Sequence, residues 1–189
     1  MTCVVALEHK GEVYFGCDST GVKDDQVLAK IPRNDEKIFK NGPFLIGFTS
    51  SFRMGQILRY SLKIPRQGRK QVMTYLVNDL MDTVRSTFKK KGFSSKKSED
   101  DSSDYGGEFL LGYKGRVYSI GSDYQVGINT NGYAAVGCGE PIAMGSFHST
   151  KDVRDPVKRC RMALEAAATF SAGVEGPFKF MSTASKGYL

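Results

Sequence analysis

The chain has 189 residues, 40% of them hydrophobic, which is enough for one domain with its own core and too short to expect two. No apolar run approaches the roughly 20 residues that span a bilayer, so an integral membrane protein is not expected. The net charge of +7 raises the question of nucleic acid, but the densest basic run, residues 89–97, is followed directly by an acidic run, residues 99–104. Nucleic-acid binding is therefore a minor hypothesis, and a charged flexible loop is expected at about residues 92–107 of a single domain spanning residues 1–189.

The cysteines and glycines exclude several kinds of site. Cys3, Cys17, Cys138 and Cys160 lie far apart and form no CxxC pair, and nothing resembling a signal peptide precedes the first predicted strand. We therefore expect a cytoplasmic, reducing location without disulfides or a metal site. No phosphate-binding glycine pattern follows a strand, so no cofactor is expected.

The first predicted element is a β-hairpin. Residues 3–8 and 13–17 are apolar and rich in β-branched side chains, and Lys10 and Gly11 supply the turn between them. A turn centred there pairs positions whose numbers sum to about 21, which brings Asp18 opposite Cys3. The hairpin is therefore expected to return Asp18 to the start of the chain.

A second strand pair is predicted at residues 37–39 and 44–48, turned by the NGP sequence at residues 41–43. Ser50 or Ser51 then caps a short helix. In the longer helix that follows, apolar residues recur every four positions and predict a buried stripe, and two neighbours are expected to widen it. The stripe comprises Val72, Leu76, Leu80, Val84 and Phe88, widened by Met73 and Val77.

The remaining elements repeat the same order. Strands are predicted at residues 108–113, 116–120 and around 134–136, followed by two helices opened by Pro141 and Pro156 and by a last strand within residues 177–182. Helix pairs that alternate with antiparallel hairpins predict an α+β fold of two stacked sheets, covered by helices on both outer faces.

Few residues are available for catalysis. His9 and His148, the only histidines, fall at a predicted turn and at a helix end, which gives poor support to a Ser-His-Asp or Cys-His mechanism. Thr2 remains, because removal of Met1 would expose a hydroxyl and an α-amine on one residue. An α-amine has a pKa near 8 and can act as the base for its own hydroxyl. Considered alone, Thr2 is better explained as an ordinary strand residue.

Four segments, TCVVAL, GCDS, DEKIF and GFTSS, resemble in order and spacing the proteasome β-subunits and HslV-like peptidases of the N-terminal nucleophile (Ntn) hydrolases. The segments GCDSTGV, FTSSFRMGQ and VGCG are most similar to uncharacterised phage and bacterial proteasome-like proteins. The resemblance implies a four-layer αββα sandwich of two antiparallel sheets. It also implies a threonine peptidase that cleaves polypeptide substrates through an acyl-enzyme, forms a homo-oligomeric ring and admits an AAA+ ATPase as a partner.

The resemblance also assigns roles to individual residues. Thr2 matches the nucleophile, Asp18 the carboxylate after the second strand, and Lys37 the lysine that polarises the threonine. Ser50 falls where the family has a glycine whose backbone N–H binds the oxyanion. Cys138 falls where the family usually has a serine that hydrogen-bonds the N-terminal amine, and a thiol is the weaker partner.

A second pair of family residues, an Asp and a Ser, corresponds here to Ser171 and Val174. These departures, with Cys138, favour a rival hypothesis. In the rival, the chain is a non-catalytic Ntn-fold assembly subunit of a phage or bacterial particle.

Overall fold

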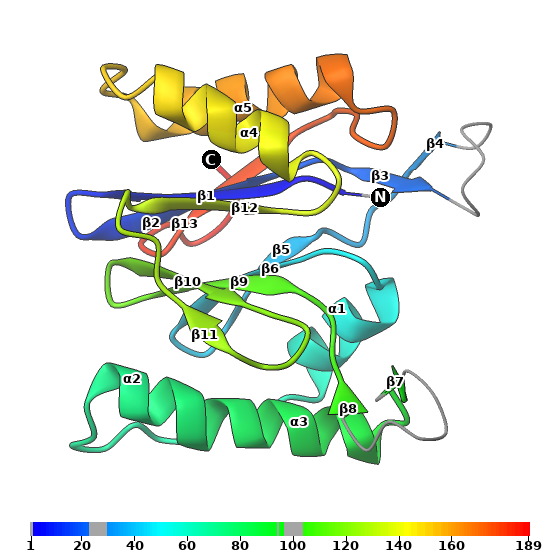
Figure 1. Ribbon diagram of the computed structural model, residues 1–189, viewed down its shortest axis with the longest axis vertical. Helices are drawn as coiled ribbons and strands as arrows, with labels where there is room; N and C mark the ends of the chain where they lie inside the picture. The colour runs from blue at the N-terminus through cyan, green and yellow to red at the C-terminus, as the bar shows by residue number, and fades with distance from the viewer. Residues whose placement is uncertain (1, 23–29, 94, 97–103) are drawn as a thin grey trace.

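The computed structural model describes residues 2–22, 30–93, 95–96 and 104–189, which form four layers (Figure 1). The first sheet has the strand order β12-β1-β2-β13 and the second the order β11-β10-β9-β6-β5. The strands of the first sheet are β1 (Val4–His9), β2 (Glu12–Cys17), β12 (Tyr133–Val136) and β13 (Lys179–Ser182). Those of the second are β5 (Ile38–Asn41), β6 (Phe44–Phe48), β9 (Phe109–Tyr113), β10 (Arg116–Ile120) and β11 (Val126–Gly127).

Helices cover the outer face of each sheet, as the fold prediction required (Figure 1). The first sheet is covered by α4 (Glu140–Ser149) and α5 (Pro156–Phe170). The second is covered by α1 (Phe52–Tyr60), α2 (Val72–Thr74), the π-helix η1 (Tyr75–Leu80) and α3 (Met81–Lys90). All the pairings within the two sheets are antiparallel. The α+β sandwich of two antiparallel sheets is thus confirmed.

The first hairpin has the predicted register. Val4 pairs with Cys17, so the partner numbers sum to 21, and the turn residues Lys10 and Gly11 have φ values of 49° and 80°. Positive φ at both central positions is typical of the tight hairpin turn that matches strand twist. The backbone N–H of Asp18 donates to the carbonyl oxygen of Cys3 at 3.2 Å, which places Asp18 at the start of the chain.

The long helix corrects one prediction. Leu76, Leu80 and Val84 are buried as expected, but Met73 and Val77 are 37% and 45% exposed. The reason is the π-helical turn at Tyr75–Leu80, whose i→i+5 hydrogen bonding widens the helix and changes which side chains face the core. Instead of the two predicted neighbours, Tyr75 packs inward against Phe44 and the second sheet.

Two short strand pairs were not predicted. β3 (Thr20–Val22) pairs with β4 (Lys30–Pro32), and β7 (Ser95–Lys96) pairs with β8 (Asp104–Tyr105). The second pair lies in the segment where a charged loop was expected at about residues 92–107, of which residues 94 and 97–103 lie outside the described part of the chain.

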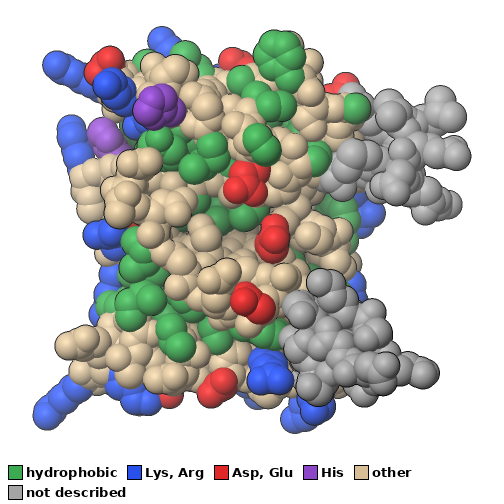
Figure 2. All heavy atoms as spheres, in the orientation of Figure 1, with side chains coloured by type: hydrophobic (Ala, Val, Ile, Leu, Met, Phe, Trp, Pro, Cys, Tyr) green, Lys and Arg blue, Asp and Glu red, His purple; other side chains and the backbone are tan. Residues whose placement is uncertain are grey.

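The described residues form no concentrated patch of positive charge on the face drawn in Figure 2. Lys and Arg side chains lie mainly toward the edges of that face, while acidic side chains run down its middle. In the described part of the chain, no helix combines the length and apolar character that crossing a membrane requires.

Candidate active site

The β1–β2 hairpin brings Thr2 and Asp18 together. The backbone N–H of Cys3, the residue after Thr2, donates to Asp18 Oδ1 at 2.9 Å, and Asp18 is fully buried. Thr2 itself is 4% exposed. The first residues of the chain are therefore held in the sheet by the carboxylate that the sequence assigned to the site.

Lys37 reaches this carboxylate from the other sheet. Its Nζ lies 2.8 Å from each oxygen of Asp18 and donates to the carbonyl oxygen of Thr20 at 2.7 Å. The Lys37 side chain is only 2% exposed. A buried ammonium is tolerated when it is paired and its donors are satisfied, and here all three donor positions have a partner.

Burial has two electrostatic effects at the site. Burial raises the pKa of the Asp18 carboxyl, while Lys37 and the backbone N–H groups of Cys3 and Thr20 oppose that rise. Burial also raises the pKa of the Cys3 thiol far above its ordinary value, which leaves it protonated and a poor nucleophile. The hydroxyl of Thr2 is the better candidate.

The VGCG segment closes over the backbone of Thr2. Gly137 has a φ of 101°, and a Cβ atom there would lie 2.2 Å from the carbonyl oxygen of Thr2, so only glycine fits. Cys138 Sγ lies 3.4 Å from the nitrogen and 3.4 Å from the carbonyl oxygen of Thr2. The hydroxyl of Ser171 in turn donates to Cys138 Sγ at 3.5 Å.

Ser171 and Val174, which correspond to the second pair of family residues, therefore differ in what they contribute to the site. Ser171 reaches Thr2 through the Cys138 thiol, a polar chain that the sequence did not predict. Val174 is buried in the apolar cluster beneath α5 and offers no polar group.

Ser50 lies in the loop between β6 and α1. Its φ of 70° is in the left-handed region, which favours glycine and is strained for serine. Ser51 caps α1, accepting a hydrogen bond from the backbone N–H of Met54. The hydroxyl oxygen of the preceding Thr49 would lie 2.9 Å from a Cβ on Gly137, so this loop lies against the segment that covers Thr2.

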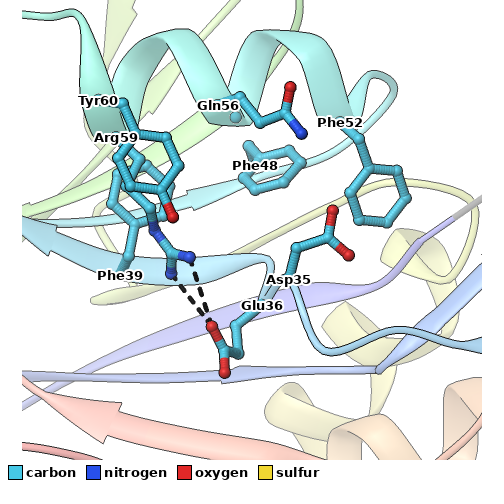
Figure 3. Close-up of a pocket in the computed structure, with 9 residues that line it drawn as sticks. Asp35, Glu36, Phe39, Phe48, Phe52, Gln56, Arg59 and Tyr60 are labelled. Carbon is cyan, nitrogen blue, oxygen red and sulfur yellow. Dashed lines mark hydrogen bonds and ion pairs between the residues drawn. The ribbon is translucent and has the colours of Figure 1, made fainter.

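A small pocket of about 80 Å³ lies near Lys37 (Figure 3). Its Phe52 ring has its centroid 5.9 Å from Lys37 Nζ. The charges in its wall are paired, Asp35 with Arg33 and Glu36 with Arg59. The lining comprises Asp35, Glu36, Phe39, Phe48, Phe52, Gly55, Gln56, Arg59 and Tyr60.

The sequence did not predict this pocket. Its walls come from α1, from the end of β6, and from β5 with the residues leading into it, and no short motif spans them. The aromatic residues on either side of the loop that contains Ser50 were the available signal.

No protein-family model matches the chain, and a search of curated proteins finds no match. Solved structures do match over nearly the whole chain. BPH from Thiobacillus denitrificans in complex with epoxomicin is 20% identical, with a TM-score of 0.75, over 96% of this chain and 97% of that one. HslV from Trypanosoma brucei is 16% identical, with a TM-score of 0.68, over 96% of this chain and 98% of that one. Anbu (ancestral beta-subunit) from Yersinia bercovieri is 12% identical, with a TM-score of 0.67, over 100% of this chain and 86% of that one.

The chain therefore has the proteasome-type fold of the Ntn hydrolases. In this fold the described structure brings Thr2, Asp18, Lys37 and Cys138 together, with Ser50 on the adjoining loop.

Proposed function

We propose that the protein is a threonine peptidase whose nucleophile is Thr2, exposed by removal of Met1. The observation that carries the proposal is the buried Lys37–Asp18 pair, which is hydrogen-bonded to the backbone directly after Thr2. A fully buried ammonium beside a potential amine base is costly to maintain and has a chemical use there.

In the proposed reaction, the Thr2 hydroxyl attacks the carbonyl carbon of a peptide bond while the α-amine of Thr2 accepts the hydroxyl proton. The nearby Lys37 charge lowers the pKa of that amine, which keeps part of it neutral near pH 7. The tetrahedral intermediate collapses to an ester on Thr2, and the leaving amine takes the proton. Water then hydrolyses the ester and regenerates Thr2.

Other residues support these steps. The backbone N–H of Ser50, close to the N-terminus of α1, is the proposed donor to the oxyanion. Cys138 contacts the nitrogen of Thr2, and Ser171 in turn holds the Cys138 thiol. The pocket in Figure 3, with three phenylalanines in its lining and its charges paired, suits an apolar side chain of the substrate.

Labelling with an electrophile tests the proposal. Intact mass should show the loss of one methionine, and incubation with epoxomicin should add one equivalent of the inhibitor at Thr2, located by peptide mapping. Thr2→Ala should fold and assemble identically and should not be labelled. A retained Met1 together with no labelling of the wild type would refute the peptidase and favour the non-catalytic assembly subunit.

We also propose that the chain forms a homo-oligomeric ring, hexameric or heptameric, that restricts access to Thr2. The most exposed large apolar side chains on the helices are Tyr60 on α1, Val77 on η1 and Phe170 on α5, at 76%, 45% and 77%. In the proposed ring, neighbouring subunits cover these side chains. Sedimentation velocity tests this, because a single species near the chain mass of 20.8 kDa would rule out the ring.

A further inference from the structure

A second ion pair joins the two sheets at the residue next to Lys37. Glu36 Oε1 accepts a hydrogen bond from Lys179 Nζ at 3.2 Å. Lys179 lies on β13, where its register partner is Cys17, the residue before Asp18. Consecutive residues 36 and 37 therefore each bind an oppositely charged side chain from neighbouring positions of the other sheet.

The other carboxylate oxygen of Glu36 binds a helix. Glu36 Oε2 accepts from both terminal nitrogens of Arg59 at 3.4 Å, and Arg59 belongs to α1. The same guanidinium donates to the carbonyl oxygen of Ile38 at 3.3 Å, and the hydroxyl of Tyr188 donates to that oxygen at 3.4 Å. Both chain neighbours of Lys37 are thus held by side chains from other elements.

These groups are largely shielded from water. The side chains of Glu36, Arg59 and Lys179 are 22%, 20% and 27% exposed. Burial alone would raise the pKa of Glu36, but its hydrogen bonds and the charges of Lys179 and Arg59 bring that pKa below its ordinary value. The carboxylate is therefore ionised at neutral pH, so that its ion pairs with Lys179 and Arg59 are present there.

We propose that Glu36 is a positioning residue for Lys37: by holding β13 and α1 together at the start of β5, it sets where the Lys37 ammonium lies relative to Asp18 and Thr2. The inference rests on the proposed function. Its physical basis is that the Lys37–Asp18 pair crosses between two sheets, so its geometry depends on how the sheets are placed. The effect of a charge on a neighbouring pKa changes steeply with distance at this range.

The test is the pH dependence of epoxomicin labelling in Glu36→Gln, which keeps the side-chain size and removes the charge. If Lys37 moves away from Thr2, the pKa of the Thr2 amine rises. The midpoint of the labelling profile should then move to higher pH by about half a unit to one unit, less than the 1–3 units that complete loss of a close charge can cause. Labelling at pH 7 should fall by about threefold to tenfold, because each pH unit changes the neutral fraction about tenfold well below the pKa. Cys138, which contacts the Thr2 nitrogen, remains unchanged in this variant, as do Ser171, Asp18 and Lys37 around it.

A purely structural role would lower the amount of active protein without moving the midpoint. If Glu36→Gln fails to fold, Lys179→Gln takes its place, because it removes the other partner of the Glu36–Lys179 ion pair at a more exposed position. It should shift the midpoint in the same direction. Asp79→Asn is the matched control, because it removes one carboxylate charge from the exposed Lys70–Asp79 pair. If the wild type is labelled and the labelling midpoints of Glu36→Gln and Lys179→Gln are both unshifted, this inference alone is overturned. If the wild type is not labelled, the proposed function is overturned and this inference with it.

Discussion

Lys37→Met removes the ammonium from the buried pair while keeping most of the side-chain volume. Three hydrogen bonds from Nζ are lost, two to Asp18 and one to the carbonyl oxygen of Thr20. Breaking a buried pair by removing one partner costs about 3–5 kcal/mol in unfolding free energy. Asp18 keeps the backbone N–H groups of Cys3 and Thr20 as donors, so we expect the lower end, about 3 kcal/mol at pH 7.

The cost should depend on pH in a defined direction. Burial holds the folded-state pKa of the Asp18 carboxyl above its unfolded value, and loss of Lys37 raises it further. A raised carboxyl pKa favours the folded state most at pH values below the unfolded pKa of about 4, and this stabilisation is lost as the pH rises through the folded pKa. Lys37→Met should therefore be most destabilising at pH 7 and progressively less so toward pH 4.

Urea unfolding followed by far-UV circular dichroism measures this, since the chain has no tryptophan. Wild type and variant are compared at equal oligomeric state, because assembly adds to apparent stability. The double variant Asp18→Asn with Lys37→Met removes both charges and should recover much of the loss, with little dependence on pH. A loss under about 1 kcal/mol at pH 7, or one that does not shrink on acidification, would refute the reasoning.

Three further predictions concern the neighbourhood of Thr2. Lys37→Met should slow epoxomicin labelling by on the order of a hundredfold at pH 7 and recover partly at alkaline pH, because the Thr2 amine then titrates higher; a uniform loss across the pH profile would contradict this role. Cys138→Ser should raise the labelling rate constant about twofold to tenfold, since a hydroxyl is the stronger hydrogen-bond partner; an unchanged or lower rate constant would argue against amine positioning by this side chain. Gly137→Ala should lower the unfolding free energy by about 3 kcal/mol, because its Cβ would overlap the Thr2 carbonyl oxygen; near-normal urea stability would show that the VGCG turn can move away.

Local patterns predicted much of the fold and part of the candidate site. The Lys10–Gly11 turn set the hairpin register, and that register alone placed Asp18 beside Cys3. Prolines at the first turns of α4 and α5 placed both helix starts. These features depend on backbone conformation and on hydrogen bonds between residues close in the sequence, so a short segment contains the information for each of them.

Other features were decided only by tertiary structure. The π-helical turn changed which side chains of the long helix are buried, and the recurrence of apolar residues every four positions could not reveal it. Ser171 contacts Cys138 across 33 positions, and Glu36 binds Lys179 across 143. Such contacts depend on how the two sheets and their helices are stacked, because side chains that meet between layers need no particular spacing along the chain. The sequence by itself therefore determined which candidate reactive groups are present and the hairpin that carries two of them, whereas the packing of the layers decided which charges surround them.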